Sequence, residues 1–317
     1  MITSYYLENG TLHEDTHNDH RGPLWIDLLD PTPDEIEAVE NLTGIDLPSL
    51  SDMQEIEISS RLYEENGAHY MTLTYVIDAL GEHPKSEPLT FVLAGDRLVT
   101  LRYGASRMIA HFAEHARVRG GLNMSSGAGI MEGLLENIID WFADVLEYNN
   151  TQVEAMSQAI FSGSRKVSHN DYFKQIGKLG ERNSMVQEGL VSLSRVQAYL
   201  SVMPSFNKEQ DSRSRLKTLD ADIRSLLEHA AFVSSKLTFL LDATLGLVNI
   251  EQNQIIKIFS VAAVVFMPPT LVASIYGMNF KYIPELQWHY GYPFALAIMV
   301  VAAIIPCLFF AYKGWLK

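Results

Sequence analysis

Two long stretches near the C-terminus contain no charged residue, and they constrain the fold more than any other feature. Asp, Glu, Lys and Arg are absent from Ile258 to Phe280 and again from Leu286 to Tyr312. Each stretch reaches the ~20 residues that an α-helix needs to cross the hydrocarbon layer at ~1.5 Å per residue. We therefore predict two transmembrane helices, at about 255–276 and 292–312, joined by an outer loop at about 277–291.

The charges around these stretches predict how the chain is oriented. The predicted loop carries only Lys281 and Glu285, whereas further basic residues flank the spans on their other side, at Lys236, Lys257, Lys313 and Lys317. Basic residues favour the cytoplasmic side of a membrane. The sequence also opens without the basic stretch and apolar run of a secretory leader. We expect a multi-pass protein with both termini in the cytoplasm.

The chain as a whole has the composition of a globular protein. Of its 317 residues, 47% are hydrophobic and 20% charged, which excludes a disordered or collagen-like chain. A single cysteine, Cys307, cannot form an internal disulfide. The formal charge of −14 repels phosphate backbones and favours cations as partners. We expect cations as partners and no nucleic acid.

Residues 1–120 alternate strand-like runs with helix patterns and predict a cytosolic α/β (α+β) domain. A helix should begin at Thr32 as N-cap, with Pro33 in its first turn, and end at Gly44. Strands are expected at 24–28, at 69–78 and at 89–103, the last turning at 94–96. A helix over 106–119 and a glycine-rich linker over 120–129 follow.

Helical periodicity takes over in residues 130–254, which we interpret as a region of long coiled-coil helices, a stalk. Helices are expected from 130 to about 161 and from about 170 to 202. In the third helix, apolar residues alternate spacings of three and four from Leu216 to Leu247, a coiled-coil seam. No proline separates this seam from the first span, so we expect one continuous helix from about 212 to 276. The transmembrane region is 255–317.

One face of the first span carries small and polar residues at spacings of three, four and seven. A polar group within a bilayer is costly unless it faces protein or water, so this stripe suggests an aqueous path. A helix–helix interface of small residues would give the same pattern. Because one helix cannot enclose a path, the first reading requires several copies of the chain around an axis. The stripe comprises Asp242, Asn249, Asn253, Ile256, Ser260, Met267, Thr270 or Leu271, Ser274 and Gly277.

Two further features should alter the helix of the first span, one in its middle and one at its end. The pair Pro268-Pro269 removes two backbone donors, frees the carbonyls of Val264 and Val265, and should bend or widen the helix. At the outer end, Gly277 permits a turn and Asn279 offers an amide carbonyl.

With these features in place, the segment from Val248 to Pro293 resembles the CorA family of divalent-cation channels. It reads VNIEQNQIIKIFSVAAVVFMPPTLVASIYGMNFKYIPELQWHYGYP, and the Gly-Met-Asn motif within YGMNF is the family's signature. A weaker likeness covers WIDL and DMQEIEISSRLYEENG in the N-terminal region. The resemblance implies a CorA-like funnel: a homopentameric channel for Mg²⁺ in the cell inner (plasma) membrane, whose long helix continues into the pore.

The resemblance also implies roles for individual residues. Gly277, Met278 and Asn279 would form the outer mouth of the pore, and Met267 and Ile256 would be hydrophobic gates. Polar rings would follow along the pore, formed by Asn253, Thr270, Ser260 and Asp242. The family senses cytosolic Mg²⁺ with carboxylates between subunits, and Asp220 and Asp222 lie in the corresponding part of the stalk, where Asp78 or Glu82 of a neighbour could face them.

Physical chemistry makes this function intelligible. Mg²⁺ dehydrates reluctantly, so amide carbonyls that accept hydrogen bonds from a hydrated ion suit a mouth better than a cage of carboxylates. A divalent ion gains ~4.6 kcal/mol on crossing ~100 mV of inside-negative potential. The chain has no Walker-type phosphate loop. Uptake would therefore be passive, with no cofactor, and Mg²⁺ would be both the transported ion and a regulator.

Two other functions are left open. One is a related transporter of Zn²⁺, Co²⁺ or Ni²⁺, with or without proton coupling, because the stripe alone does not choose among hydrated divalent ions. The other is a membrane-anchored metalloenzyme or sensor, since His111, Glu114 and His115 fit the zinc pattern H-x-x-E-H. A run of acidic residues and histidines, best read as a solvated loop, is a further possible metal binder at His13, Glu14, Asp15, His17, Asp19 and His20.

Overall fold

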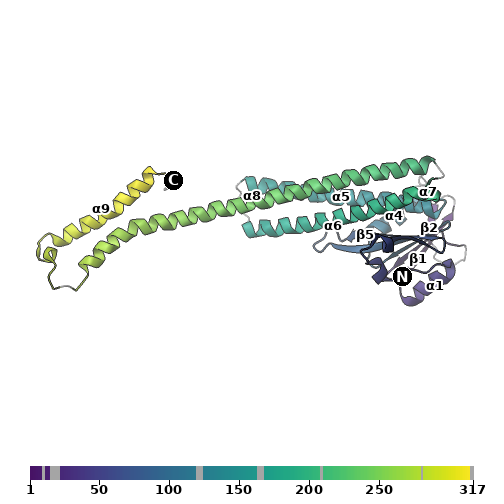
Figure 1. Ribbon diagram of the computed structural model, residues 1–317, viewed down its shortest axis with the longest axis horizontal. Coiled ribbons are helices and arrows are strands. Elements are labelled where there is room, and N and C mark those ends of the chain that lie inside the picture. The colour runs from purple at the N-terminus through teal and green to yellow at the C-terminus, as the bar shows by residue number, and fades with distance from the viewer. Residues whose placement is uncertain are drawn as a thin grey trace. The chain divides into compact units, whose positions relative to one another are not determined.

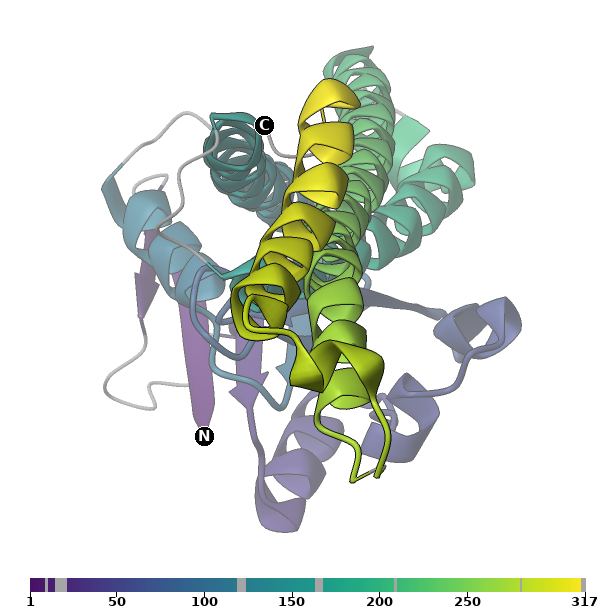
Figure 2. The ribbon, with the colours of Figure 1, turned by 90° about the vertical axis from the view of Figure 1, so that its left-hand side faces the viewer.

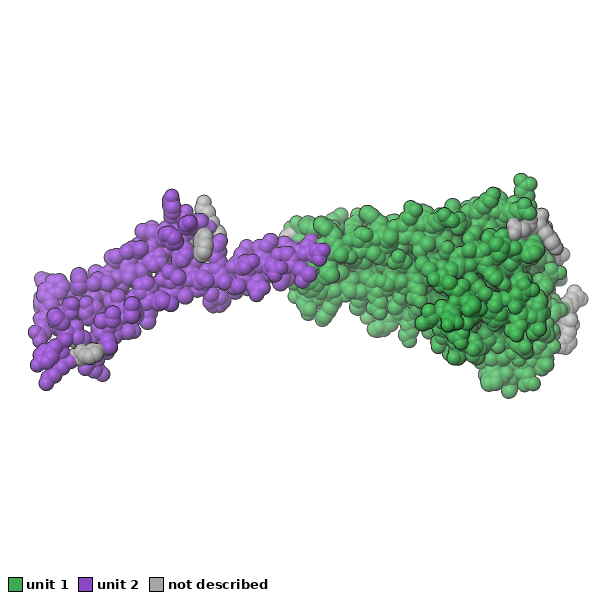
Figure 3. All heavy atoms as spheres, in the orientation of Figure 1, with its two compact units in different colours: residues 1–241 green, residues 242–317 purple. Residues whose placement is uncertain are grey.

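The computed structural model describes residues 1–8, 11–14, 22–118, 124–162, 168–207, 210–279 and 281–314. By packing, the chain divides into two units, residues 1–241 and residues 242–317 (Figure 3). The two units do not correspond to the three predicted parts of the sequence, 1–120, 130–254 and 255–317. That three-part division stays a prediction. Each unit is described by itself below.

Unit 1 is built on a seven-stranded mixed sheet. The strand order is β2-β1-β3-β7-β6-β5-β4, in which β3 and β7 are parallel and all other neighbours are antiparallel. The strands are β1 (Ile2–Glu8), β2 (Thr11–Glu14), β3 (Trp25–Leu29), β4 (Leu62–Glu65), β5 (Ala68–Ile77), β6 (Lys85–Ala94) and β7 (Arg97–Arg102). The predicted strands at 24–28, 69–78 and 89–103 are confirmed within a few residues, and the turn at 94–96 joins β6 to β7.

Helices cover both faces of this sheet, because alternate side chains of each strand point to opposite faces. On one face, Ile26, Val92 and Val99 form a core with Val39 of α1 (Pro33–Thr43) and Met53 of α2 (Leu50–Met53). The short α3 (Ile58–Arg61) leads into β4. The opposite face forms the largest core, with residues of α4 (Arg107–Val118), α5 (Gly127–Phe161), α6 (His169–Val202) and α8 (Gln210–Tyr276). This arrangement is the predicted α/β domain followed by long helices.

The first helix ends where the sequence predicted. Thr32 is its N-cap, and its hydroxyl accepts from the backbone amide of Glu35, whose carboxylate accepts in turn from the amide of Thr32. Gly44 closes the helix in the left-handed region at φ 71°, a conformation that glycine adopts without a Cβ clash. The local signals alone were sufficient here.

The long helices are also confirmed. α5, α6 and the part of α8 in unit 1 lie side by side (Figure 1) and close a second, smaller core that includes Val153, Ile176 and Val233. The α8 seam is buried from Leu216 to Thr244, although Leu226 is only partly buried and Leu247 is exposed, so the seam is one position shorter than its pattern. α7 (Pro204–Asn207) lies between α6 and α8.

The predicted linker over 120–129 is wrong at its end. α5 begins at Gly127, with Ser126 as its N-cap, and residues 119–123 lie outside the described residues. A Cβ on Gly127 would come within 2.7 Å of the backbone of Arg97 and Leu98. Glycine at this position therefore allows the start of α5 to pack closely against β7. The glycine-rich composition of the segment does not reveal this contact.

Unit 2 contains the end of α8, a 3-10 turn η1 (Pro284–Gln287) and α9 (Gly291–Tyr312). α9 turns back along the end of α8 (Figures 1 and 2). The predicted helix bounds 255–276 and 292–312 agree with these helices, α8 being continuous through the first span. Both are long and apolar enough to cross a membrane, and little of either apolar segment is buried within the chain.

Candidate functional site

The predicted stripe on α8 is exposed throughout the part of unit 2 that the structure describes. Asn253, Ile256 and Ser260 follow one another at spacings of three and four, and Met267 and Thr270 continue the same face. Ile256 is 53% exposed and Met267 67% exposed. Asp242, the first residue of unit 2, is exposed as well. The structure thus places these side chains on one unpartnered helix face.

A hollow of about 430 Å³ lies on the N-terminal part of this stripe. It is lined by Asn253, Ile256 and Ser260 of the stripe together with Ile250, Gln254 and Lys257. Amide, hydroxyl and ammonium groups there adjoin two isoleucines. Three of the predicted pore residues are therefore neighbours on one surface, as the α-helical period requires.

The middle of the span is set by the proline pair. Pro268 and Pro269 lie inside α8, and the Thr270 hydroxyl donates to the backbone carbonyl of Phe266 at 2.7 Å. The hydroxyl proton of Thr270 is thus used within its own helix, and the oxygen lone pairs are left to face outward. Such an oxygen can accept a hydrogen bond from the water shell of a cation.

The C-terminal end of α8 closes at Gly277. Its amide donates to the carbonyl of Ala273 at 2.9 Å, and the amide of Met278 donates to the carbonyl of Ile275 at 3.3 Å. Met278 and Asn279 are exposed beyond this turn. The Gly-Met-Asn motif therefore lies at the end of the helix with its side chains free of the chain's own core.

The start of α9 is fixed by a close approach at Gly291. A Cβ on this glycine would meet the carbonyl oxygen of Glu285 in η1 at 2.1 Å, so only glycine fits. The amide of Gly291 donates to the carbonyl of Trp288 at 3.0 Å, and Trp288 packs edge-on against Phe294. The loop after Asn279 is therefore anchored on α9.

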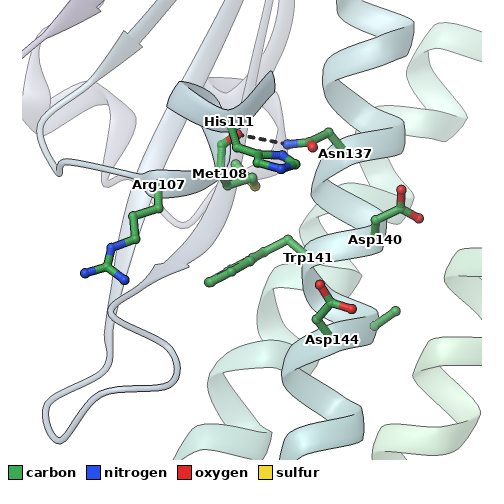
Figure 4. Close-up of a pocket in the computed structure, with 8 residues that line it drawn as sticks. Arg107, Met108, His111, Asn137, Asp140, Trp141 and Asp144 are labelled. Carbon is green, nitrogen blue, oxygen red and sulfur yellow. Dashed lines mark hydrogen bonds between the residues drawn. The ribbon is translucent and has the colours of Figure 1, made fainter. Parts of the chain in front are cut away.

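A second hollow, of about 550 Å³, lies in unit 1 between α4 and α5 (Figure 4). The hollow is lined by Arg107, Met108 and His111 of α4 and by Asn137, Asp140, Trp141, Ala143 and Asp144 of α5. The Asn137 side-chain amide donates to the carbonyl of Met108 at 3.0 Å and ties the two helices together. The side of α5 beside this hollow is acidic.

Electrostatics in this region connect α5 with α8. Partial burial raises the pKa of the Asp140 carboxyl, and the charges of Asp144 and of Asp222 in α8 raise it further. Partial burial likewise raises the pKa of Glu136, an effect that Arg215 of α8 opposes. Carboxylates that repel one another in this way would be stabilised by a cation.

The two predicted regulatory acids differ in their surroundings. Asp220 is already paired with Arg224, one helical turn further on, at 2.9 Å. Asp222 lies near Asp140 instead. Sequence reasoning missed Asp140 and Asp144, although their spacing of four, continued back to Glu136, places three acids on one face of an amphipathic helix and was a usable signal.

The histidine patterns do not form a metal site in the described residues. His111 and His115 are neighbours on α4, with ring centroids 3.9 Å apart, and the Nδ1 atom of His115 lies 3.1 Å from the carbonyl of His111. No group of three His, Cys, Asp or Glu side chains that could hold a metal exists among the residues described. His13 and Glu14 belong to strand β2 rather than to a loop, and residues 15–20 lie outside the described residues.

Comparison with known proteins gives a consistent picture. A family model described as CorA-like Mg²⁺ transporter protein matches residues 21–313. The magnesium transport protein CorA of Yersinia pseudotuberculosis is 36% identical over 327 residues, and that of Escherichia coli strain K12 is 34% identical over 324 residues, with both chains covered completely in each case. The complete structure of the CorA magnesium transporter from Methanocaldococcus jannaschii matches with a TM-score of 0.81 at 20% identity, covering 99% of this chain and 98% of that one.

Proposed function

The chain belongs to the CorA-like Mg²⁺ transporter family, and from that premise we propose that it carries Mg²⁺ across the cell inner membrane as a homopentameric channel. Members of this family are transporters or channels, so this chain is not an enzyme. Uptake would be passive, driven by a membrane potential that is worth ~4.6 kcal/mol for a divalent ion at ~100 mV. Both termini would lie in the cytoplasm, with lipids around the two spans.

The observation that carries this proposal is the exposed polar face of α8. Asn253, Ser260 and Thr270 lie within or at the edge of an apolar helix and are not covered by the rest of the chain. In contrast, α9 contains no polar side chain from Pro293 to Ala311 other than the Cys307 thiol. A bilayer does not solvate amides and hydroxyls, so α8 of several copies would surround an aqueous path, with α9 toward the lipid.

The residue roles follow from this arrangement. Asn279, with Gly277 and Met278, would accept hydrogen bonds from hydrated Mg²⁺ at the outer mouth. Thr270, Ser260, Asn253 and Asp242 would form polar rings in turn toward the cytoplasm. Met267 and Ile256 would be constrictions that close the path by excluding water.

A related transporter of Zn²⁺, Co²⁺ or Ni²⁺, with or without proton coupling, remains the alternative. The first span contains neither His nor Cys, and its stripe offers amide and hydroxyl oxygens. Oxygen ligands suit Mg²⁺, whereas imidazole and thiolate suit the later transition metals. The ligand chemistry therefore favours Mg²⁺.

Reconstitution into liposomes tests the proposal. Vesicles containing a Mg²⁺ indicator and held at an inside-negative potential should fill when the native chain is present, and a Zn²⁺ indicator should respond less. Asn279→Ala should lower Mg²⁺ uptake roughly tenfold or more, because each copy loses an acceptor of hydrogen bonds from the ion's water shell. Gln287→Ala, which removes an amide from the same outer loop, should leave uptake unchanged.

Two results would count against the proposal. Equal uptake by the Asn279→Ala and native chains would refute the role of Asn279. A monomer in mild detergent would refute the pore, because one chain supplies a single lining helix.

We further propose that cytosolic Mg²⁺ regulates the channel through Asp220 and Asp222, with Asp222 the more important. Asp222 adds to the negative field around Asp140, whereas Asp220 is already paired with Arg224. Since the described residues of one chain offer no complete metal site, the remaining ligands would come from a neighbouring copy, where Asp78 and Glu82 are candidates.

Limited proteolysis of the full chain tests this regulation. Mg²⁺ should protect the native chain, and Asp222→Asn should raise the Mg²⁺ concentration needed for protection more than Asp220→Asn does. Protection that is the same in all three chains would refute regulation at these residues.

A further inference from the structure

The unusual feature of the first span is that its two prolines are consecutive. In an α-helix, the carbonyl of residue i accepts from the amide of residue i+4, and a proline at that position has no N–H to give. For the carbonyl of Val264, residue i+4 is Pro268 and residue i+5 is Pro269. A single proline leaves the next amide available for a wider turn, but the pair removes that option also. Val264 therefore has a carbonyl oxygen that its own helix cannot satisfy in the usual way.

Few other protein groups in the spans can donate to this oxygen. An unsatisfied backbone carbonyl in hydrocarbon costs several kcal/mol, so a partner is required. The side chains of α9 from Pro293 to Ala311 include no hydroxyl, amide or charged group. On α8, the nearest hydroxyl on the C-terminal side is Thr270, which donates to Phe266. The amide of Met267, at i+3, is committed in an α-helix to the carbonyl of Ala263, so water is the partner best able to satisfy this oxygen.

The position of Val264 on the helix directs this oxygen toward the stripe. Val264 follows Ser260 by four residues and precedes Met267 by three, so it shares their face, and its side chain is exposed. Val265, whose carbonyl loses its donor to Pro269, lies about 100° further round the helix. Of the two freed carbonyls, that of Val264 is the one on the stripe.

We propose that the Val264 carbonyls of the assembled copies form a mid-membrane binding ring for a hydrated divalent cation, between Ser260 and the Met267 constriction. The waters of a hydrated Mg²⁺ ion point their hydrogens outward, and a carbonyl oxygen accepts them as an amide side chain does. The ring supplies polarity where the side chains are apolar. This inference rests on the proposed pore.

An ester replacement tests the ring without altering the prolines. Incorporating the α-hydroxy acid of valine at position 265 converts the Val264 carbonyl from an amide to an ester, which is a weaker acceptor. Mg²⁺ influx into liposomes should fall about fivefold, or the Mg²⁺ concentration for half-maximal influx should rise by a similar factor. The matched control places the α-hydroxy acid of phenylalanine at 266, which weakens the Val265 carbonyl, and should change influx less than twofold.

The outcomes separate this inference from the proposed function. A native chain that takes up no Mg²⁺ would overturn the pore and the ring together. Uptake by the native chain, with equal losses in the two ester variants, would overturn the ring alone. Should an ester chain fail to assemble, Pro268→Ala and Pro269→Ala provide the same comparison, because each restores one amide donor: a larger loss for Pro268→Ala supports the ring, and equal losses refute it.

Discussion

The two units of this chain differ in where their side chains find partners. In residues 1–241, aromatic and aliphatic side chains of the sheet are fully buried between helices of the same chain, and even the charges of Asp27 and Arg102 are paired inside. In residues 242–317, only 6% of the most apolar window of α8 and 11% of that of α9 is buried. In the first unit, contacts within the chain bury the apolar side chains. In the second unit, the apolar side chains need surroundings that one chain does not supply.

This contrast gives the exposed apolar surface a meaning. Large apolar surfaces on a soluble protein mark a partner or a membrane. Ile258 and Phe259 are exposed to about the same extent as Met267, although the helix presents them in different directions. The exposure of a side chain in a single chain therefore cannot distinguish lipid-facing from pore-facing residues. The position of a residue relative to the polar stripe is what distinguishes them. The following predictions test that distinction.

The largest effect is expected where unit 1 satisfies its own charges. Arg102 donates to both carboxylate oxygens of Asp27, at 3.2 and 2.7 Å, and Thr100 donates to the same carboxylate at 2.7 Å. Arg102→Met leaves the Asp27 charge buried without its partner and should cost about 3–5 kcal/mol of unfolding free energy. Thermal or denaturant unfolding of the full chain in detergent measures this.

The exposed pair in the same unit provides the control for that experiment. Asp220 and Arg224 form a surface pair on α8, and Arg224→Met should cost less than about 1 kcal/mol. Equal losses for Arg102→Met and Arg224→Met would contradict the view that unit 1 is held by its interior.

Thiol accessibility should show the next largest effect and applies the comparison to unit 2. In a Cys307→Ser background, Ser260→Cys lies on the stripe, and Ile258→Cys lies about 160° away on the same turn of α8. Both positions are exposed in the single chain. In the assembled protein, a thiol in lipid stays protonated, so Ser260→Cys should react with a charged thiol reagent roughly 100-fold faster.

The same two reaction rates show which result would contradict the prediction. Faster reaction at Ile258→Cys than at Ser260→Cys would mean that the stripe is the dry face. The aqueous path, and with it the polar rings, would then have to be abandoned.

The same contrast explains what the sequence could predict. The two spans, the continuous α8 and the Thr32 cap were found because each depends on residues within a few turns of one another. The strands β1 and β2 were missed although they pair with each other on either side of Asn9-Gly10, a dipeptide typical of a hairpin turn, so a local signal was available. Gly127, the first residue of α5, was assigned to a linker because the need for glycine there arises from the close approach of β7.

In the candidate site, too, some features could be predicted from the sequence and others could not. Helical period alone placed Asn253, Ser260, Met267 and Thr270 on one face of α8, and the structure has them there. The approach of Asp222 to Asp140 joins residues on two helices and could not be deduced from either. The roles of the rings and gates depend on neighbouring copies, so they stay predictions.

A smaller effect is expected at the proposed gate. Met267→Ala removes a flexible apolar side chain from the stripe and should raise resting Mg²⁺ leak into liposomes several-fold, because a wider constriction holds water more readily. Phe266→Ala deletes a larger side chain one residue earlier, about 100° round the helix, and should leave the leak unchanged. A leak that increases equally in both variants would assign the effect to general loosening of the span.

The smallest effect concerns the acidic surface of unit 1. Burial and the charges of Asp144 and Asp222 raise the pKa of Asp140, so the folded chain binds this proton more tightly than the unfolded chain, whose Asp pKa is ~3.9. The carboxylate therefore lowers stability as pH rises through its folded-state pKa, and Asp140→Asn should stabilise the chain at pH 7 but not well below pH 3.9.

Because Asp140 remains largely exposed, solvent screening limits this gain to a few tenths of a kcal/mol. The melting temperature of the Mg²⁺-free chain at the two pH values is the measurement. Glu147→Gln removes the same charge two turns further along α5 and is the control. Added Mg²⁺ should reduce the difference between Asp140→Asn and the native chain, since a bound cation relieves the repulsion that the mutation removes; a difference that grows with Mg²⁺ would show that the acids do not share a cation.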